Sequence, residues 1–437
     1  MKHLAARFAR NQLVQNAAAL YGVQVVRKVL PLVLVPYLAR ILDPSGWGVL
    51  AFTQSLAEFV VLVIEFGFNL SATREIARNR HSTAACGEIM AGVLGSQFIL
   101  AVGGLCGAFL VSRAIPVLRD NPKLLAAGFF YAIAQGFIPL WFFQGLERMR
   151  LAATLEISGR VVGLISIFLL VRSSDDIWLA LLIQGIAPAL TTVIGIAMAY
   201  RYIPCRMPTP SLIRNAMARG WRMFVFRSGE SLYCVGNAFI LGLFVSPVQV
   251  GYFASAEKIS RAMFGLLNPI RETLYPRLSN IVNRSPQDAL RLARTGVKVM
   301  MSGGVLLGAG VFLFAPVLIG LLMGQAFTPA VTVLRILSVL PVLLAVTQSA
   351  GIQWLIPLGR EADVNRVILQ AGALNVALAV LLAPRFAQNG MAWSVVCAEM
   401  FVSCSLIHAV RRSRPEFIGT SEQAHLHELA RVGETTL

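Results

Sequence analysis

The chain consists of long apolar runs separated by short polar connections. A transmembrane helix needs about 20 predominantly apolar residues. By this rule the pattern predicts membrane spans at 17–38, 48–68, 89–111, 124–144, 157–171, 177–199, 223–244, 250–269, 299–322, 331–355, 366–383 and 390–410. The sequence therefore predicts an all-α polytopic membrane protein with about twelve transmembrane helices.

The longest gap between apolar runs divides the predicted spans into two sets of six. In order along the chain, the predicted parts are a cytoplasmic N-terminal arm, a first six-helix half, a cytoplasmic linker, a second six-helix half and a cytoplasmic tail, at 1–16, 17–199, 200–222, 223–410 and 411–437.

Composition and charge support a membrane location. The chain is 57% hydrophobic and only 14% charged, whereas a soluble domain carries about 25% charged residues. The net charge of +17 comes largely from Lys and Arg in alternate loops. Cytoplasmic loops carry such an excess, so we expect both termini in the cytoplasm. The basic residues do not form a stripe with interleaved aromatic residues, so we expect no nucleic-acid partner.

The two halves contain a weak repeat at an offset of 203 residues. "DPSGWGVLAF" aligns with "SPVQVGYFAS", which places Pro44 on Pro247 and Gly48 on Gly251. Polar positions inside the first two spans of each half coincide as well. The offset preserves topology, so the halves should be parallel repeats around a central cavity that binds substrate near the midplane.

Charged side chains lie deep in four of the predicted spans. A charge at the bilayer centre costs about 2.5–3.5 kcal/mol on insertion scales, so these stripes should face a water-filled cavity between spans 1, 2, 7 and 8. The cations are suited to phosphate, and the predicted head-group ligands are Arg27, Lys28, Arg227, Lys258 and Arg261. The acids are candidates for proton or sodium coupling or for charge pairing: Glu58, Glu65, Glu230 and Glu257.

A structural role is the alternative for any of these charges, because pairs such as Arg27–Glu58 could simply hold helices together. Three further in-membrane charges, Arg160, Arg335 and Glu399, have no companion stripe. We expect those three to be structural.

Several stretches resemble one family of exporters. "YLARILDPSGWGVLAFTQSL", "EFGFNLSATREIARNR", "WFFQGLERM", "VGYFASAEKI" and "LYPRLS" are similar to segments of Wzx-type polysaccharide repeat-unit flippases. These belong to the polysaccharide branch of the multidrug/oligosaccharidyl-lipid/polysaccharide exporter superfamily. At Trp47 this chain departs from the Gly-Phe-Gly turn that is usual in the family.

The resemblance implies a function. Such proteins move undecaprenyl-pyrophosphate-linked oligosaccharide between leaflets of the bacterial cytoplasmic (inner) membrane, for O-antigen, exopolysaccharide or lipopolysaccharide synthesis. It implies membrane lipid as a partner, with a polysaccharide polymerase and a chain-length regulator as further candidates. In-membrane arginines hold the pyrophosphate in related flippases, which by position points to Arg27 and to Lys258 or Arg261 here.

Other functions fit less well. An ion-coupled exporter of small drug-like compounds on the same fold is the main alternative, but five in-membrane cations do not suit a cationic cargo. The short outer loops argue against a membrane enzyme. The sequence contains no Walker-type loop, so we do not expect direct use of ATP. The two histidines of "HLH" in the tail are too few ligands for a metal site. We expect no cofactor, and an antiporter mechanism with proton or sodium coupling stays open.

Overall fold

The computed structural model describes residues 2–267, 286–356 and 360–434. Side chains are described between Leu30 and Arg412, except for 31–32, 149–153, 155, 226, 230–234, 286–290, 293–294 and 352–353 within that range. Helices make up almost all of the described residues, and no strand occurs among them. The predicted all-α class is confirmed.

The first bundle begins with a long kinked helix, α1 (Lys2–Glu65), which contains the predicted span 17–38 and most of the span 48–68. The two parts meet at Asp43, whose φ of 57° interrupts the helix. The other helices of this bundle are α2 (Phe68–Arg78), α3 (Thr83–Arg113), α4 (Pro116–Arg119), α5 (Pro122–Gly136), α6 (Leu140–Gly145), α7 (Met149–Leu170), η1 (Ser174–Asp176) and α8 (Ile177–Ala199).

The second bundle follows a helix that starts inside the predicted linker. This helix, α9 (Pro210–Cys234), runs on into the predicted span 223–244. After it come α10 (Asn237–Gly242), α11 (Pro247–Gly265), α13 (Pro286–Leu322), η2 (Gln325–Phe327), α14 (Ala330–Leu337), α15 (Leu340–Thr347), η3 (Gln348–Leu355) and α16 (Glu361–Glu434). In α16 the predicted spans 366–383 and 390–410 join at Ala387, which has a φ of 49°.

Helices lie at the positions of all twelve predicted spans, but not all of them qualify as spans by themselves. Among the described residues, seven helical stretches are long and apolar enough to cross a membrane. Two of these, Val33–Arg78 and Glu361–Arg412, include a kink between neighbouring predicted spans. A multi-pass membrane protein is thus supported, whereas the number twelve stays a prediction.

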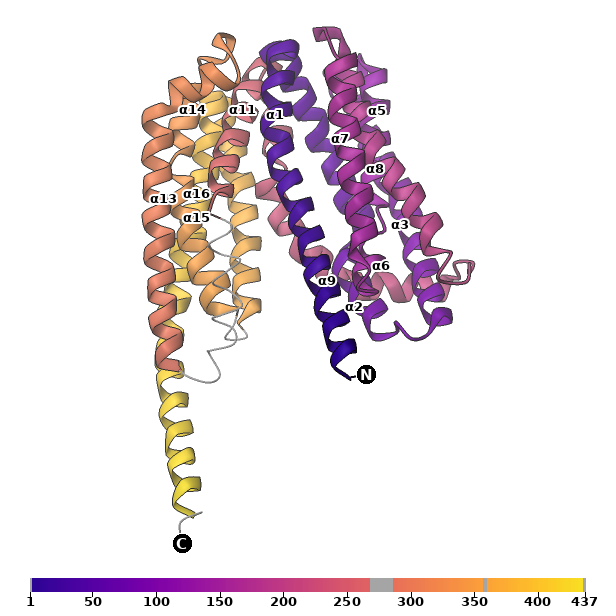
Figure 1. Ribbon diagram of the computed structural model, residues 1–437. Helices are drawn as coiled ribbons and strands as arrows, with labels where there is room; N and C mark the ends of the chain where they lie inside the picture. The colour runs from indigo at the N-terminus through magenta and orange to yellow at the C-terminus, as the bar shows by residue number, and fades with distance from the viewer. Residues whose placement is uncertain (1, 268–285, 357–359, 435–437) are drawn as a thin grey trace.

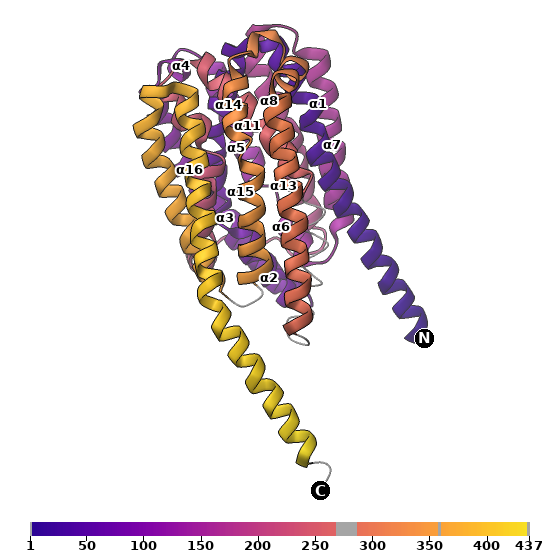
Figure 2. The same cartoon turned by 90° about the vertical axis from the view of Figure 1, so that its left-hand side faces the viewer.

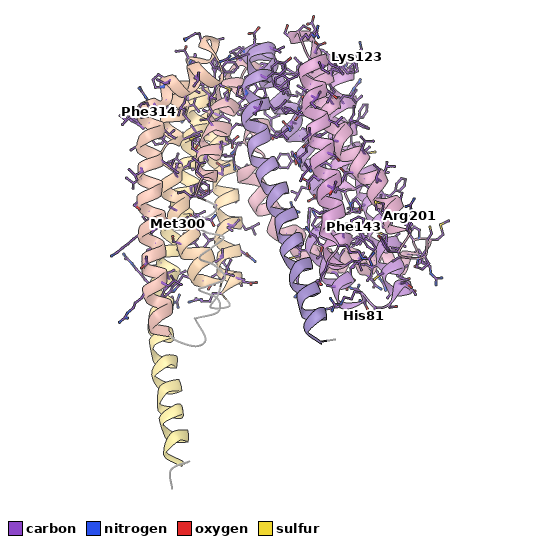
Figure 3. The ribbon with its side chains drawn as sticks, in the orientation of Figure 1. His81, Lys123, Phe143, Arg201, Met300 and Phe314 are labelled. Atoms are coloured by element: carbon purple, nitrogen blue, oxygen red, sulfur yellow. The ribbon has the colours of Figure 1, made fainter. Side chains whose placement is uncertain are left out.

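The outer surface of the bundles is apolar, as a lipid-facing surface requires. On α13, Leu306 is 73% exposed, Leu313 68% and Phe314 60%. Figure 3 shows Phe314 on the outer side of the second bundle. Side chains of this kind would aggregate in water, but they match the hydrocarbon core of a bilayer.

The two bundles lie side by side and meet at one end. Figure 1 shows α1 against α11 at the top of the view, and the ribbons diverge toward the bottom, where both termini lie. Figure 2 shows the same end from the side, with the C-terminal part of α16 reaching beyond the bundles. His81 and Arg201, from two of the basic loops, lie toward this end, whereas Lys123 lies at the other (Figure 3). These two predicted cytoplasmic loops therefore lie toward the end of the molecule that contains the termini.

The aligned glycines of the repeat form the contact between the two bundles. A Cβ on Gly48 would collide with the carbonyl oxygen of Pro247, and a Cβ on Gly251 would collide with the carbonyl oxygen of Pro44. The contact is reciprocal, as expected when two related segments pack about a pseudo-twofold axis. Small residues allow helix backbones to approach closely in membranes, which explains why both positions are glycine.

A second connection joins the bundles near the end with the termini. Phe66 and Gly67 separate α1 from α2 with φ values of 40° and 75°, and this break packs against α9. The rings of Phe66 and Phe224 stack with centroids 4.6 Å apart. Arg219 of α9 pairs with Glu75 of α2. Helix α9 is therefore held on the first bundle before it continues into the second.

The glycine contact can be tested by adding one methyl group. We expect Gly48→Ala or Gly251→Ala to lower the stability of the detergent-purified protein by about 1–3 kcal/mol, because the new atom has no space. Thermal unfolding measures the effect. Gly310→Ala on α13 is the control, since nothing lies within 4 Å of its Cβ. Equal melting temperatures for Gly48→Ala and wild type would contradict the close approach.

Candidate functional site

Two adjoining cavities lie mainly within the first bundle. The upper cavity, on the side of the glycine contact, has a volume of about 230 Å³ and is lined by α1, α5, α7, α8 and one residue of α11. The lower cavity, of about 470 Å³, is lined by α1, α2, α5, α6, α7 and one residue of α9. Gln135, Ile138 and Arg160 line both, so the two cavities are direct neighbours.

Three cations line this space at successive levels. Arg227 of α9 lines the lower cavity, Arg160 of α7 lines both, and Lys258 of α11 lines the upper cavity. Arg227 and Lys258 come from segments of the predicted second half. Both cavities therefore contain cationic side chains, with contributions from both parts of the chain.

Each arginine has a carboxylate partner. Arg160 pairs with Glu156 one turn earlier on α7 at 3.0 Å, and Glu156 is 8% exposed. Arg227 pairs with Glu65 of α1 at 2.7 Å, and this ion pair joins α9 to the first bundle. Pairing is what makes a guanidinium tolerable at membrane depth.

Lys258 is placed by an aromatic ring. Its ammonium nitrogen lies 5.5 Å from the centroid of the Trp47 ring, a cation–π geometry. Glu58, one turn below Gln54 on α1, accepts a 2.6 Å hydrogen bond from the Tyr131 hydroxyl of α5. Lys258 is also close enough to Glu58 to interact with it electrostatically.

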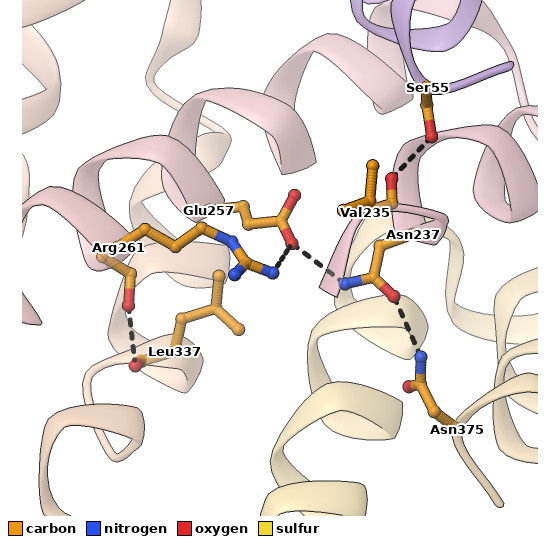
Figure 4. A network of polar contacts seen from close by, with 8 residues as sticks. Ser55, Val235, Asn237, Glu257, Arg261, Leu337 and Asn375 are labelled. Carbon is orange, nitrogen blue, oxygen red and sulfur yellow. Dashed lines mark hydrogen bonds and ion pairs between the residues drawn. The ribbon is translucent and has the colours of Figure 1, made fainter. Parts of the chain in front are cut away.

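A separate polar network occupies the second bundle (Figure 4). The Asn237 amide donates to Glu257 Oε1 at 2.9 Å, and the same oxygen accepts from Arg261 at 2.9 Å. Asn375 of α16 donates to Asn237 Oδ1 at 2.9 Å. Asn237 and Asn375 are fully buried, and Glu399, which interacts electrostatically with Arg261, is 4% exposed. The network concentrates amide and carboxylate oxygens in the membrane.

The structure divides the nine predicted site residues into three groups. Arg227, Lys258 and Glu65 line the cavities, and Glu58 is tied to Tyr131 of the upper cavity. Glu257 and Arg261 belong to the network of the second bundle. The side chains of Arg27, Lys28 and Glu230 lie outside those that the structure describes.

The cavities have more walls than expected. The sequence predicted a cavity between spans 1, 2, 7 and 8; residues of α1, Arg227 of α9 and Lys258 of α11 do line the described cavities, but α5, α7 and α8 supply much of the remaining lining. Uncharged side chains explain the difference: Gln135 on α5 and Gln184 on α8 line the space. A search for charged stripes does not detect such residues.

Arg160 was expected to be structural, yet it is the one charged residue that lines both cavities. The signal that could have revealed it was the spacing of Glu156 and Arg160, which puts an acid and a base on one face of a predicted span. Arg335, by contrast, lies over the ring of Phe312 at 5.5 Å. No cluster of three or more potential metal ligands occurs within the described part of the chain.

Sequence comparison identifies the family. The family described as "Polysaccharide biosynthesis protein" matches residues 13–282, more than half of the chain. A protein of Escherichia coli (strain K12) named "Putative O-antigen transporter" is 30% identical over 404 residues, covering 92% of this chain and 97% of that protein. A Shigella dysenteriae protein of the same name is 25% identical over 404 residues, covering 91% and 100%.

Solved structures share the fold. An inward-facing multidrug transporter of the MATE family and MOP superfamily superposes with a TM-score of 0.70 at 15% identity, over 93% of this chain and 99% of the other. The lipid II flippase MurJ, in an inward closed conformation, superposes with a TM-score of 0.71 at 11% identity, over 91% and 87%. The chain therefore belongs to the family described as polysaccharide biosynthesis protein, and it has the fold that these solved structures share.

Proposed function

We propose that this protein moves undecaprenyl-pyrophosphate-linked oligosaccharide from the cytoplasmic to the periplasmic leaflet of the bacterial inner membrane. The observation that carries the proposal is the position of Arg160, where the two cavities join and between the levels of Arg227 and Lys258. The names of the relatives, which include O-antigen transport and flippase activity, support a saccharide cargo.

A diphosphate group suits the cations of this path. Guanidinium groups bind phosphate oxygens through two parallel hydrogen bonds, and an ammonium group adds a compact charge. Arg160 is placed to contact a head group in either cavity, with Arg227 behind it and Lys258 ahead. The same three positive charges would repel a cationic drug.

Substrate binding would exchange one anion for another. Arg160 and Arg227 are paired with Glu156 and Glu65, so a diphosphate that binds the guanidinium groups competes with those carboxylates. A carboxylate that loses its partner inside a membrane is costly, and uptake of a proton or a sodium ion offsets that cost. This exchange gives a physical reason for ion coupling.

The network of the second bundle is the candidate coupling site for the ion. Carboxylate and carboxamide oxygens are suitable ligands for hard cations, and Asn237, Glu257, Asn375 and Glu399 supply them. Ser55 of α1 donates to the backbone oxygen of Val235 at 2.6 Å, just before Asn237 (Figure 4). Ion binding beside Asn237 can therefore be transmitted to α1 through this contact.

Alternating access would follow from the two connections between the bundles. The glycine contact closes the end remote from the termini, and its loss would open that end. The α9 segment that carries Arg219 and Phe224 would stay with the first bundle and act as the connection during rocking. With the termini in the cytoplasm, the described state is closed on the periplasmic side.

The central test is transport by an Arg160 variant. We expect Arg160→Ala to reduce surface polysaccharide at least tenfold in a bacterium that lacks its own repeat-unit flippase, because the diphosphate loses its shared ligand. Lipid-linked precursor should accumulate in the inner leaflet. Arg335→Ala, which removes a cation outside both cavities, is the control. Normal export by Arg160→Ala at wild-type protein levels would rule out this site.

Charge reversal separates the structural from the ligand role of Arg227. We expect Arg227→Glu to destabilise the protein, because two carboxylates then face each other. The double variant Glu65→Arg/Arg227→Glu should recover its melting temperature but not its transport, since the cation now lies on α1. Recovery of both would mean that the pair only joins the helices.

Ion coupling can be measured in proteoliposomes. We expect an imposed proton or sodium gradient to accelerate flipping by the wild type several-fold, and Glu257→Gln to remove that response without changing substrate binding. Asp176→Asn, in the η1 turn outside the spans, should retain the response. Separate pH and sodium gradients identify the ion. A full response of Glu257→Gln would exclude the network as the coupling site.

A further inference from the structure

The connection between α8 and α9, residues 200–209, lies at the outer edge of the first bundle. Figure 3 shows Arg201 there, on the side away from the second bundle. Arg201 follows Leu190, on the exposed face of α8, by about three helical turns and lies on the same side. Pro208 packs directly on Gly95 of α3, one turn before Phe98, which is 66% exposed. Two lipid-facing surfaces therefore end at this connection, which places it at the level of the lipid head groups.

The connection is fixed to the bundle by two of its residues. Ile203 is buried in the cluster that contains Trp141. The carbonyl oxygen of Pro204 lies 2.8 Å from the place that a Cβ on Gly87 would take, so the backbone packs closely on α3. All residues from 201 to 209 except Ile203 are exposed. The side chains of the connection are therefore presented outward from a fixed backbone.

Four exposed arginines of this region have no carboxylate partner. Within the described part of the chain they form no ion pair, whereas Arg80 pairs with Glu147 and Arg219 pairs with Glu75. The neighbouring acids are Glu147, which already has a partner, and Glu88 on α3. The four arginines are Arg148, Arg201, Arg206 and Arg214. This part of the surface is therefore positively charged.

Arg148 connects a second loop to the same surface. Its guanidinium group lies 4.3 Å from the centroid of the Tyr202 ring. Stacking on a ring leaves the N–H groups at the edge of a guanidinium able to donate to an anion. Met207, in the same connection as Tyr202, is 84% exposed. The surface thus combines cations with amphipathic and apolar side chains, which is the combination that suits a membrane interface.

We propose that this surface, the basic edge (Arg148, Arg201, Tyr202, Arg206, Met207 and Arg214), binds the head group of an anionic phospholipid. Guanidinium groups bind phosphate oxygens through paired hydrogen bonds, and arginines next to a membrane attract anionic lipids. A soluble acidic partner would use these charges but would leave Met207 exposed at the level of the head groups. No residue of the basic edge lines either cavity, so this inference goes beyond the proposed function and does not depend on the cargo.

The bound lipid would hold the start of α9 at the membrane surface. Helix α9 begins at Pro210, directly after the connection, and its Phe224 stacks on the first bundle before the helix reaches the second. A phospholipid bound by Arg206 and Arg214 therefore joins the connection to the first turns of α9. The lipid would anchor the first bundle in the leaflet on the side of the termini.

Native mass spectrometry of the purified full-length protein tests this proposal, because it resolves individual lipid-binding events. The probes are dioleoyl phosphatidylglycerol, which is anionic, and dioleoyl phosphatidylcholine, which has the same chains and a phosphate but no net charge. We expect the wild type to bind phosphatidylglycerol at least tenfold more tightly. The variant Arg201→Gln/Arg206→Gln/Arg214→Gln should lose at least tenfold of that affinity, since each basic residue near the surface contributes about fivefold. Its affinity for phosphatidylcholine should be unchanged.

A matched control removes three exposed arginines near the opposite ends of the helices. Arg113→Gln/Arg172→Gln/Arg385→Gln changes the net charge by the same amount and should bind phosphatidylglycerol as the wild type does. The single variant Arg206→Gln should lose about fivefold in affinity, which keeps the test independent of cumulative effects on folding. Both variants of the basic edge should keep the wild-type melting temperature, because these arginines have no described ion pair to lose.

Three results would overturn the proposal. The first is equal affinity of the wild type for the two lipids. The second is wild-type affinity for phosphatidylglycerol in the variants of the basic edge, or an equal loss in the control, since net charge alone would then explain the binding. The third is displacement of the bound lipid by equimolar glycerol phosphate, which has the phosphate without acyl chains and would reveal a site for a soluble anion.

Discussion

The cost of placing charge inside a bilayer governs this structure. Each described cation of the cavities is compensated: Arg160 by Glu156, Arg227 by Glu65, and Lys258 by the face of Trp47 together with the nearby Glu58. Such pairs contribute little net stability when desolvation is counted. Several of them in two neighbouring cavities are what the proposed exchange with an anionic substrate requires.

The same constraint explains how the two halves are arranged. A cavity with charged walls must be closed to at least one side of the membrane, and the reciprocal contact of Gly48 and Gly251 provides that closure with backbone alone. At the other end α9 stays attached to the first bundle through Phe224 and Arg219. One contact is a close approach of two helix backbones, whereas the other is aromatic and ionic. This asymmetry suits a molecule that opens at one end while its halves remain connected.

Sequence reasoning recovered the features that depend on periodicity. Apolar runs located the helices, and the offset between Pro44–Gly48 and Pro247–Gly251 marked two segments that the structure brings into contact. It could not predict which other helices line the cavities, because Gln135 and Gln184 are uncharged and resemble ordinary members of apolar spans. Arg160 was set aside because it has no companion stripe. Its partner Glu156 lies one turn away on the same helix, but most residues that share the cavities with it come from other helices.

The account depends on the proposal that the substrate passes the residues shared by the two cavities. The most direct measurement is photo-crosslinking in cells that make lipid-linked saccharide, with p-benzoylphenylalanine in place of Gln135, which lines both cavities, or in place of the lipid-facing Phe314. The account predicts a saccharide-bearing adduct at position 135 and only phospholipid adducts at position 314. If no saccharide adduct forms at position 135 in a protein that still exports polysaccharide, the account is contradicted.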